Sequence, residues 1–456
     1  MSSTFLFKTL ELILALGLLV MVHEFGHYFF SRLFGVWVEK FYLFFNPWFS
    51  LAKWKPAAKK DKNGNEVKTS WRATTYGIGW LPLGGYCKIA GMIDESMDKE
   101  QMKQPAQPYE FRSKPAWQRL LIMVGGVLFN FILAIVIYSG IVYAYGEMNI
   151  NFVDAVEGMD YCENAHKIGF QDGDIPLMAD DHVLTYPKGE EIQAMLTAKT
   201  VKVLRNHKDT VTINIPADFV FTATEDASEG FMRYRMPVVL SKVQTRMGAE
   251  NAGLQSGDHI IAVNDIPTPS YTELTPTLEK HANKTVALHC LRAGVERVDS
   301  VEVDGAGKLG ILLTEPTKVF KVNIKKYSLM ESIPRGCVMG WDKLVSYVSS
   351  LKLLFTKQGA QSLGGFGAIG SIFPETWSWL DFFNITAFLS VILAVMNILP
   401  IPALDGGHVI FLLYEIVTRR QPSEKFLERA QTVGMLLLFA LLLFANGNDI
   451  YRYFFK

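Results

Sequence analysis

Residues 23–27 read HEFGH, an H-E-x-x-H motif inside an apolar stretch that begins near Leu12. On a helix, His23 and His27 share one face, so both imidazoles can reach a single Zn²⁺. Glu24 lies beside the first histidine, where a carboxylate can take a proton from water on the metal. Ionisable residues are costly to place in a membrane and are generally functional there. The motif therefore predicts metal-dependent hydrolysis within a membrane.

A catalytic zinc site needs a third protein ligand and an open position for water. No histidine follows His27 until His166, so the third ligand is expected from a distant segment. Residues 397–408 (NILPIPALDGGH) contain one carboxylate, Asp405, in a largely apolar setting. The two prolines should break the helix and turn the chain toward a cavity. We expect Asp405 to complete the site; a solvated helix end beside a turn is the alternative.

The composition indicates membrane spans together with a sizeable soluble part. The 456 residues are 49% hydrophobic and 20% charged, with a mean hydropathy of +0.16. The formal net charge is zero, so nothing points to nucleic acid. The first apolar segment carries the histidines, and we expect it to be retained rather than cleaved. The four cysteines form no CxxC pair; Cys162 and Cys290 either pair or remain free thiols.

Charge and apolar runs predict four membrane spans and their orientation. Lysines and arginines concentrate in residues 32–118 and in the short connection after the third span, so both should be cytoplasmic. The active site then lies toward the cytoplasmic side. Residues 77–89 are apolar and rich in glycine, which predicts a membrane-associated β-hairpin or re-entrant β-loop; an ordinary cytoplasmic turn is the alternative. Its Gly84, Gly85 and Tyr86 are candidates for binding substrate by strand addition.

The block between the second and third spans contains an internal repeat. Ala165–Asp174 and Ala249–Asp258 share the pattern A-x-x-x-G-Φ-Q-x-G-D, where Φ is apolar. The pattern resembles the turn and following strand of PDZ domains, with Pro176 expected to interrupt the strand in the first copy. Such domains bind extended peptides by β-augmentation. A packing module that binds no peptide fits equally well.

Two further segments precede the third span. Apolar residues recur at spacings of three and four between Val338 and Phe355, which predicts an amphipathic helix on the membrane surface or against the soluble domains. The following residues 363–370 are too rich in glycine to predict a stable helix.

H-E-x-x-H in a first span and N-x-x-P-x-P-x-L-D-G in a late one together resemble the site-2 protease family of intramembrane metalloproteases. The tandem PDZ-like block resembles the regulator-of-sigma-E protease branch. The resemblance implies one Zn²⁺ held by His23, His27 and Asp405, with Glu24 as catalytic base and Asn397 as a contact to the substrate backbone or the transition state. Residues 53–68 look like an insertion, and residues 364–367 lack an expected proline. Both departures concern loop contacts rather than the chemistry.

The resemblance also implies a substrate class, partners and a location. The expected substrates are single-pass membrane proteins, such as anti-sigma factors after a first cut by a site-1-type protease, and remnant signal peptides. The expected location is the bacterial inner membrane, where the protein serves a stress response. A catalytically inert PDZ-bearing scaffold is the alternative function. A transporter is disfavoured because the chain shows no inverted halves.

The expected fold is a polytopic α-helical membrane protein with four transmembrane helices, a Gly-rich membrane-associated β-loop and two β-rich PDZ-like extracytoplasmic domains. The expected segments are transmembrane helix 1 (1–31), cytoplasmic loop with β-hairpin (32–118), transmembrane helix 2 (119–147), PDZ-like domains (148–228 and 229–318), amphipathic helix and Gly-rich segment (319–375), transmembrane helix 3 with the LDG motif (376–416), and cytoplasmic turn with transmembrane helix 4 (417–456).

Overall fold

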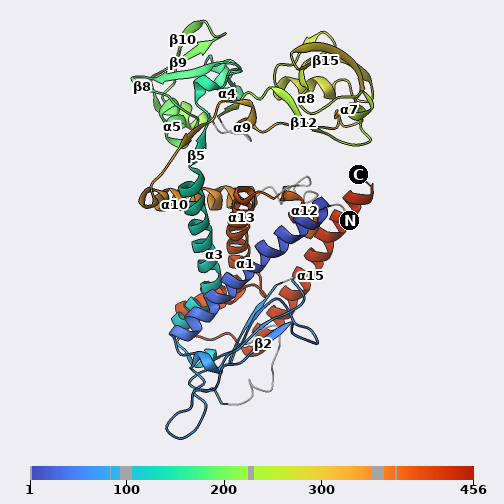
Figure 1. Cartoon of the computed structure of the whole chain (residues 1–456). Coiled ribbons are helices and arrows are strands. Elements are labelled where there is room, and N and C mark those ends of the chain that lie inside the picture. The colour runs from blue at the N-terminus through green and yellow to red at the C-terminus, as the bar shows by residue number, and fades with distance from the viewer. Residues whose placement is uncertain are drawn as a thin grey trace. The chain divides into compact units, whose positions relative to one another are not determined.

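Figure 1 shows the computed structural model of the chain, which describes residues 3–82, 84–92, 105–223, 231–351, 364–374 and 377–455. The chain forms two compact units. Met1–Gly146 and Lys326–Lys456 form the first, and Glu147–Lys325 forms the second. The first contains the long apolar helices, and the second is rich in β-strands.

Among the described residues, four helices are long and apolar enough to cross a membrane. They are α1 (Ser3–Leu33), α3 (Ala116–Tyr145), α13 (Trp379–Ile398) and α15 (Glu424–Phe455). The central helix is α3, which contacts α1, α13, α14 (Asp405–Thr418) and α10 (Leu329–Ser350). In contrast, α15 exposes many large apolar side chains, as a lipid-facing helix does.

The third predicted span consists of two helices rather than one. Because α13 ends at Ile398 and α14 begins at Asp405, only the first part of residues 376–416 is a candidate span. Pro400 and Pro402 lie in the break, and neither can donate a helical hydrogen bond. The break expected from the prolines is present, and it places Asp405 in the first turn of a new helix.

A four-stranded sheet of order β2-β3-β1-β4 follows α1. Its strands are β1 (Val38–Leu43), β2 (Ala52–Trp54), β3 (Thr75–Ile78) and β4 (Tyr86–Ile89). The predicted hairpin of residues 77–89 is wrong, because β3 and β4 do not pair with each other. Instead β1 lies between them, parallel to β3 and antiparallel to β4. Strand β4 is therefore an edge strand, and no strand of the described residues pairs with its other side.

The second unit contains two β-rich domains, each with its own hydrophobic core. The first has a sheet of order β10-β9-β7-β8 and a β11–β6 pair, and the second a sheet of order β16-β15-β13-β12-β17 with β14 on β13. Their strands are β6 (Met159–Tyr161), β7 (Ile175–Ala179), β8 (His182–Val183), β9 (Thr200–Arg205), β10 (Asp209–Asn214), β11 (Met232–Tyr234), β12 (Val238–Val243), β13 (His259–Val263), β14 (Ile266–Pro267), β15 (Thr285–Arg292), β16 (Val295–Glu302) and β17 (Ile311–Leu313).

Short helices accompany these sheets, and a pair of strands closes the second unit. The helices are α4 (Glu163–Lys167), α5 (Gly189–Thr197), α6 (Phe219–Thr222), α7 (Gly248–Asn251), α8 (Tyr271–Glu279) and α9 (Pro316–Val319). Strand β5 (Glu147–Asn149) pairs with β18 (Asn323–Lys325), so the two ends of this unit lie side by side.

The repeated aspartates have the same role in both β-rich domains. Asp174 accepts a hydrogen bond from the Gln171 N–H at 2.9 Å, and Asp258 accepts one from the Gln255 N–H at 2.8 Å. An arginine binds each carboxylate through two nitrogens, Arg205 in the first domain and Arg292 in the second. Each arginine also donates to the carbonyl of the repeated glycine, Gly169 or Gly253. The repeat therefore encodes a turn held by an ion pair between a buried aspartate and a partly exposed arginine.

Two details of these domains correct or decide the expectations. Pro176 does not interrupt its strand, because β7 runs through it with a register shift between Pro176 and Met178. Proline is tolerated at such a bulge, where a ladder hydrogen bond is already missing. Cys162 and Cys290 are both free, and each belongs to the interior of a different domain.

The predicted amphipathic helix is present as α10, which begins with a capping box between Ser328 and Glu331. The part of the prediction beyond Leu351, residues 352–355, lies outside the described residues. The expectation that residues 363–370 form no helix is wrong, because α12 (Phe366–Ile372) is helical. The Asp449 carboxylate accepts hydrogen bonds from the N–H groups of Gly365 and Ala368. This cap offsets the low helix propensity of glycine.

Candidate active site

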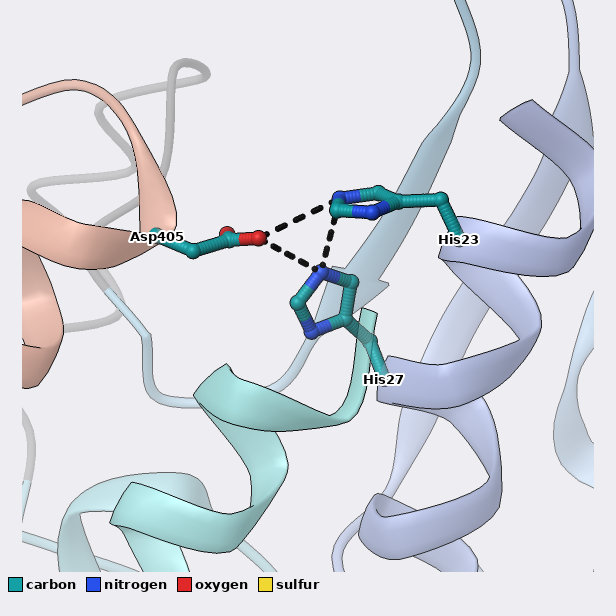
Figure 2. A group of neighbouring side chains, drawn as sticks. All are labelled: His23, His27 and Asp405. Carbon is teal, nitrogen blue, oxygen red and sulfur yellow. Dashed lines mark hydrogen bonds and ion pairs between the residues drawn. The ribbon is translucent and has the colours of Figure 1, made fainter. Parts of the chain in front are cut away.

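Three predicted residues from opposite ends of the chain meet inside the first unit (Figure 2). His23 and His27 lie one turn apart on α1, and Asp405 lies in the first turn of α14. The Asp405 Oδ2 atom is 3.2 Å from Nε2 of His23 and 3.4 Å from Nε2 of His27. The two Nε2 atoms are 3.2 Å apart. Three potential metal ligands therefore converge on one point.

Helix α3 holds the far side of both imidazoles. Nδ1 of His27 lies 2.9 Å from the Ile122 carbonyl oxygen, and Nδ1 of His23 lies 3.3 Å from the Asn130 amide. A carbonyl oxygen can only accept, so Nδ1 of His27 carries the proton and its Nε2 lone pair is free for a metal. Such contacts to the second ring nitrogen orient histidine ligands in metal sites.

Glycines allow α1 and α3 to approach closely enough for these contacts. A Cβ atom on Gly26 would lie 2.2 Å from the Gly125 carbonyl oxygen. A Cβ atom on Gly126 would lie 2.5 Å from Cε1 of His23 and 2.6 Å from Nε2 of His27. Small residues at helix crossings are the usual means of close packing within membranes. Here they also leave room for the two imidazoles.

The donor set fits a catalytic zinc ion. The ligand atoms of His23, His27 and Asp405 lie within 4.8 Å of one another, and no other group of three was found among the described residues. Asp405 Oδ2 is buried and accepts no hydrogen bond from any described residue. A buried carboxylate oxygen without a donor is costly unless a cation compensates it. Two imidazoles and one carboxylate leave a fourth tetrahedral position open.

A cavity of about 560 Å³ adjoins the cluster. It is lined by all three candidate ligands, by Glu24, and by residues of β4 and the end of α13. Glu24 and Cys87 of β4 both line this cavity, and burial, with the charge of Glu24 second, raises the pKa of the Cys87 thiol well above its usual range. The candidate base therefore lies beside both the ligands and an open sheet edge.

The candidate substrate residues fall into two groups. Asn397 lines the cavity, with its amide nitrogen 3.5 Å from Nε2 of His23. Gly85 and Tyr86 also line it, and the Tyr86 hydroxyl donates to Asn46. Gly84 is not among the lining residues; it has a φ of +150° and packs against the Phe45 ring. The structure thus brings three of the four to the cavity.

Several contributors to the site were missed from the sequence. Asn130 and Gly126 contact the histidines from α3, and Lys40 and His408 line the cavity. Asn130 had a recognisable signal, because an amide side chain in an otherwise apolar span usually faces the bundle interior. The Ile122 carbonyl had no such signal in the sequence, because every residue has a backbone carbonyl.

Comparison with known proteins agrees with this geometry. The model of "Peptidase family M50" matches residues 11–59 and 64–441. The chain is 28% identical to the regulator of sigma E protease of Haemophilus influenzae over 98% of this chain and 100% of the relative. It is 28% identical to the regulator of sigma-E protease RseP of Escherichia coli, over 98% and 99%. It is 25% identical to the metalloprotease MmpA of Caulobacter vibrioides, over 98% and 96%. The chain belongs to peptidase family M50, the site-2-type metalloproteases.

Proposed function

We propose that this protein is an intramembrane protease in which His23, His27 and Asp405 hold one Zn²⁺ and Glu24 is the catalytic base. The observation that carries the proposal is the convergence of these three ligand atoms beside a cavity that Glu24 also lines. The histidines belong to a helix apolar enough to span a membrane, so the hydrolysed bond is expected to lie within a membrane segment.

Each residue has a defined task in peptide hydrolysis. Bound zinc would supply Lewis acidity, which lowers the pKa of water and polarises the scissile carbonyl. Glu24 takes a proton from the attacking water and delivers it to the leaving amine. Asn397 donates its amide to the substrate backbone near the reacting carbonyl. The contacts between α3 and the two Nδ1 atoms hold both imidazoles in place while the substrate enters.

The open edge of β4 is the proposed substrate-binding element. A helical membrane segment hides its carbonyl groups in hydrogen bonds, so it must unwind before hydrolysis. An unwound segment can pair with β4 by strand addition, beside Gly85 and Tyr86 in the cavity wall. Strand addition recognises the backbone of the substrate more than its side chains, which suits single-pass proteins of varied sequence. Two relatives are named regulators of sigma E, which supports anti-sigma-factor-type substrates already cut once by an upstream protease.

We place the protein in the bacterial inner membrane with its active site toward the cytoplasm. Support comes from the lysines and arginines that concentrate in residues 32–118 and in the short connection after the third predicted span, since such loops are usually cytoplasmic. The two β-rich domains are proposed to be extracytoplasmic and PDZ-like, on the strength of the repeated helix, turn and strand with its Asp–Arg pair. Remnant signal peptides are a further proposed substrate class.

Cleavage of a purified single-pass membrane protein by the full-length enzyme in lipid nanodiscs tests the proposal. Mass spectrometry of the fragments should locate the cut within the membrane segment. Activity should disappear with a zinc chelator and return when zinc is restored. An inert scaffold would give no fragments under any of these conditions, and a cut confined to the soluble parts of the substrate would also refute the proposal.

A further inference from the structure

Each ring nitrogen of His23 meets an asparagine side chain. Nδ1 lies 3.3 Å from the Asn130 amide on α3, and Nε2 lies 3.5 Å from the Asn397 amide on α13. The surroundings differ: Asn130 is fully buried, whereas Asn397 lines the cavity and belongs to the proposed substrate contacts. The buried asparagine has no task in the mechanism above.

The Asn130 amide carries an unused acceptor. Its Oδ1 is buried and accepts no hydrogen bond from any described residue, while its Nδ2 faces Nδ1 of His23. Oxygen and nitrogen exchange places when an amide turns by half a rotation, and the hydrogen-bond network decides between the two orientations. With Oδ1 turned toward His23, Nδ1 of His23 carries a proton and donates it. The Nε2 lone pair then points toward Asp405 and His27.

The backbone around Asn130 is fixed to a second helix. The Ser390 hydroxyl on α13 donates to the Asn130 carbonyl at 2.7 Å, and both residues are fully buried. One turn earlier on the same face of α3, Gly126 leaves room for the imidazoles. His27 has the matching arrangement, with Nδ1 held by the Ile122 carbonyl. Helix α3 therefore places one polar group against Nδ1 of each histidine.

We propose that Asn130 is a positioning residue that holds His23 in the Nδ1-protonated tautomer and in the ring orientation required for metal binding. The inference rests on the proposed function, because it assigns His23 to a metal. Partners of the second ring nitrogen typically contribute 10- to 100-fold to metal affinity. Asn130 does not itself line the cavity and, in this assignment, does not touch the substrate.

Zinc affinity of full-length variants, measured by chelator competition in nanodiscs, tests this role without relying on activity. Asn130→Leu keeps the approximate size but removes the acceptor, and should bind zinc about 10- to 100-fold more weakly. Asn130→Asp keeps an acceptor and should lose no more than about threefold, which is below the 10- to 100-fold range. Asn384→Leu is the matched control, because among the described residues the Asn384 amide donates within α13, to the Leu380 carbonyl. It should bind zinc normally.

Two results would overturn the inference. One is an Asn130→Leu protein that binds zinc as tightly as the unmodified protein. The other is an equal loss in Asn130→Asp and Asn130→Leu, when thermal unfolding shows that both variants are folded. Failure of the proposed function is distinct, because the unmodified protein itself would then bind no zinc and cleave no substrate.

Discussion

The Asp405 carboxylate lies 3.2 Å from Nε2 of His23, although the two residues come from opposite ends of the chain. Neither half is a catalytic metal site by itself, because two histidines on one helix lack a third ligand. The helix break at Pro400 and Pro402 re-aims the chain so that α14 begins at Asp405. Folding of the bundle around α3 therefore assembles the site.

Asp405→Asn should lower zinc affinity on the order of 100-fold or more, since even the outer partners of ligands contribute 10- to 100-fold. The amide keeps the size of the side chain but loses the negative charge that faces both imidazoles. Metal analysis of the purified protein measures the effect. Asp381→Asn, at an exposed position near the start of α13, should retain zinc. Equal zinc contents in the two variants would exclude Asp405 as a ligand.

Gly126→Ala should weaken zinc binding and cleavage together. The added methyl would lie 2.5 Å from the His23 ring and 2.6 Å from Nε2 of His27, so α1 or the rings must move. Gly140→Ala is the control on the same helix, because its Cβ would meet nothing within 4 Å. Alanine there should be neutral or stabilising by up to about 1 kcal/mol. Zinc content and thermal unfolding compare the two, and identical behaviour would contradict the close packing.

Asn397→Ala should leave zinc content unchanged and reduce kcat for a membrane substrate. Loss of one hydrogen-bond donor to the reacting carbonyl typically costs about 10²- to 10³-fold in kcat. The amide borders the cavity, 3.5 Å from Nε2 of His23, and therefore faces the reaction rather than the back of the ligands. Steady-state kinetics on matched zinc-loaded samples provide the test. A change confined to KM would instead assign Asn397 to ground-state binding.

The second β-rich domain should lose stability in acid through Asp258. Its hydrogen bonds with Arg292 hold the pKa of this buried carboxyl below its usual range. A carboxyl whose pKa is lowered in the folded state contributes stability above the usual pKa of about 4. This contribution is lost as the pH falls below that value. Asp258→Asn should cost about 1.5 to 3 kcal/mol at neutral pH, the usual contribution of a hydrogen bond to a charged group, because the amide loses the charge that faces Arg292.

Hydrogen exchange of β13, corrected for the pH dependence of the intrinsic rate, reports this stability within the full-length protein. The unmodified protein should lose more protection between pH 7 and pH 3 than Asp258→Asn, which has no carboxylate to protonate. Equal protection of the two proteins at pH 7 would contradict the stabilising role of the pair.

The helical part of the fold was largely predictable because long apolar runs have few alternatives in a membrane. Pro400 and Pro402 indicated a break in the helix. They did not indicate that the following helix, α14, lies outside the candidate span. The sheet was predicted incorrectly. Strand pairing between β1 and its two neighbours depends on contacts distant in sequence, whereas a glycine-rich run between two strands favours a hairpin by local criteria alone.

The candidate ligands were identified by chemistry, since few arrangements explain two histidines and a carboxylate in apolar surroundings. The groups that hold these ligands in place were not identified from the sequence. The Ile122 carbonyl and the room left by Gly126 arise from the crossing of α1 and α3, which no local pattern specifies. The helix at Phe366 was missed for a similar reason, because its cap comes from the distant Asp449. Local propensity fails where a long-range contact supplies the missing stabilisation.

The most direct test of the central claim compares zinc content and cleavage in Glu24→Gln and the unmodified protein, prepared identically in nanodiscs. Glu24 is the proposed base but not a ligand, so the variant should contain as much zinc as the unmodified protein. Its cleavage of a single-pass substrate should fall by at least 10²-fold, the lower range for general acid–base catalysis. A variant that retains zinc and cleaves the membrane segment at the normal rate would contradict the account.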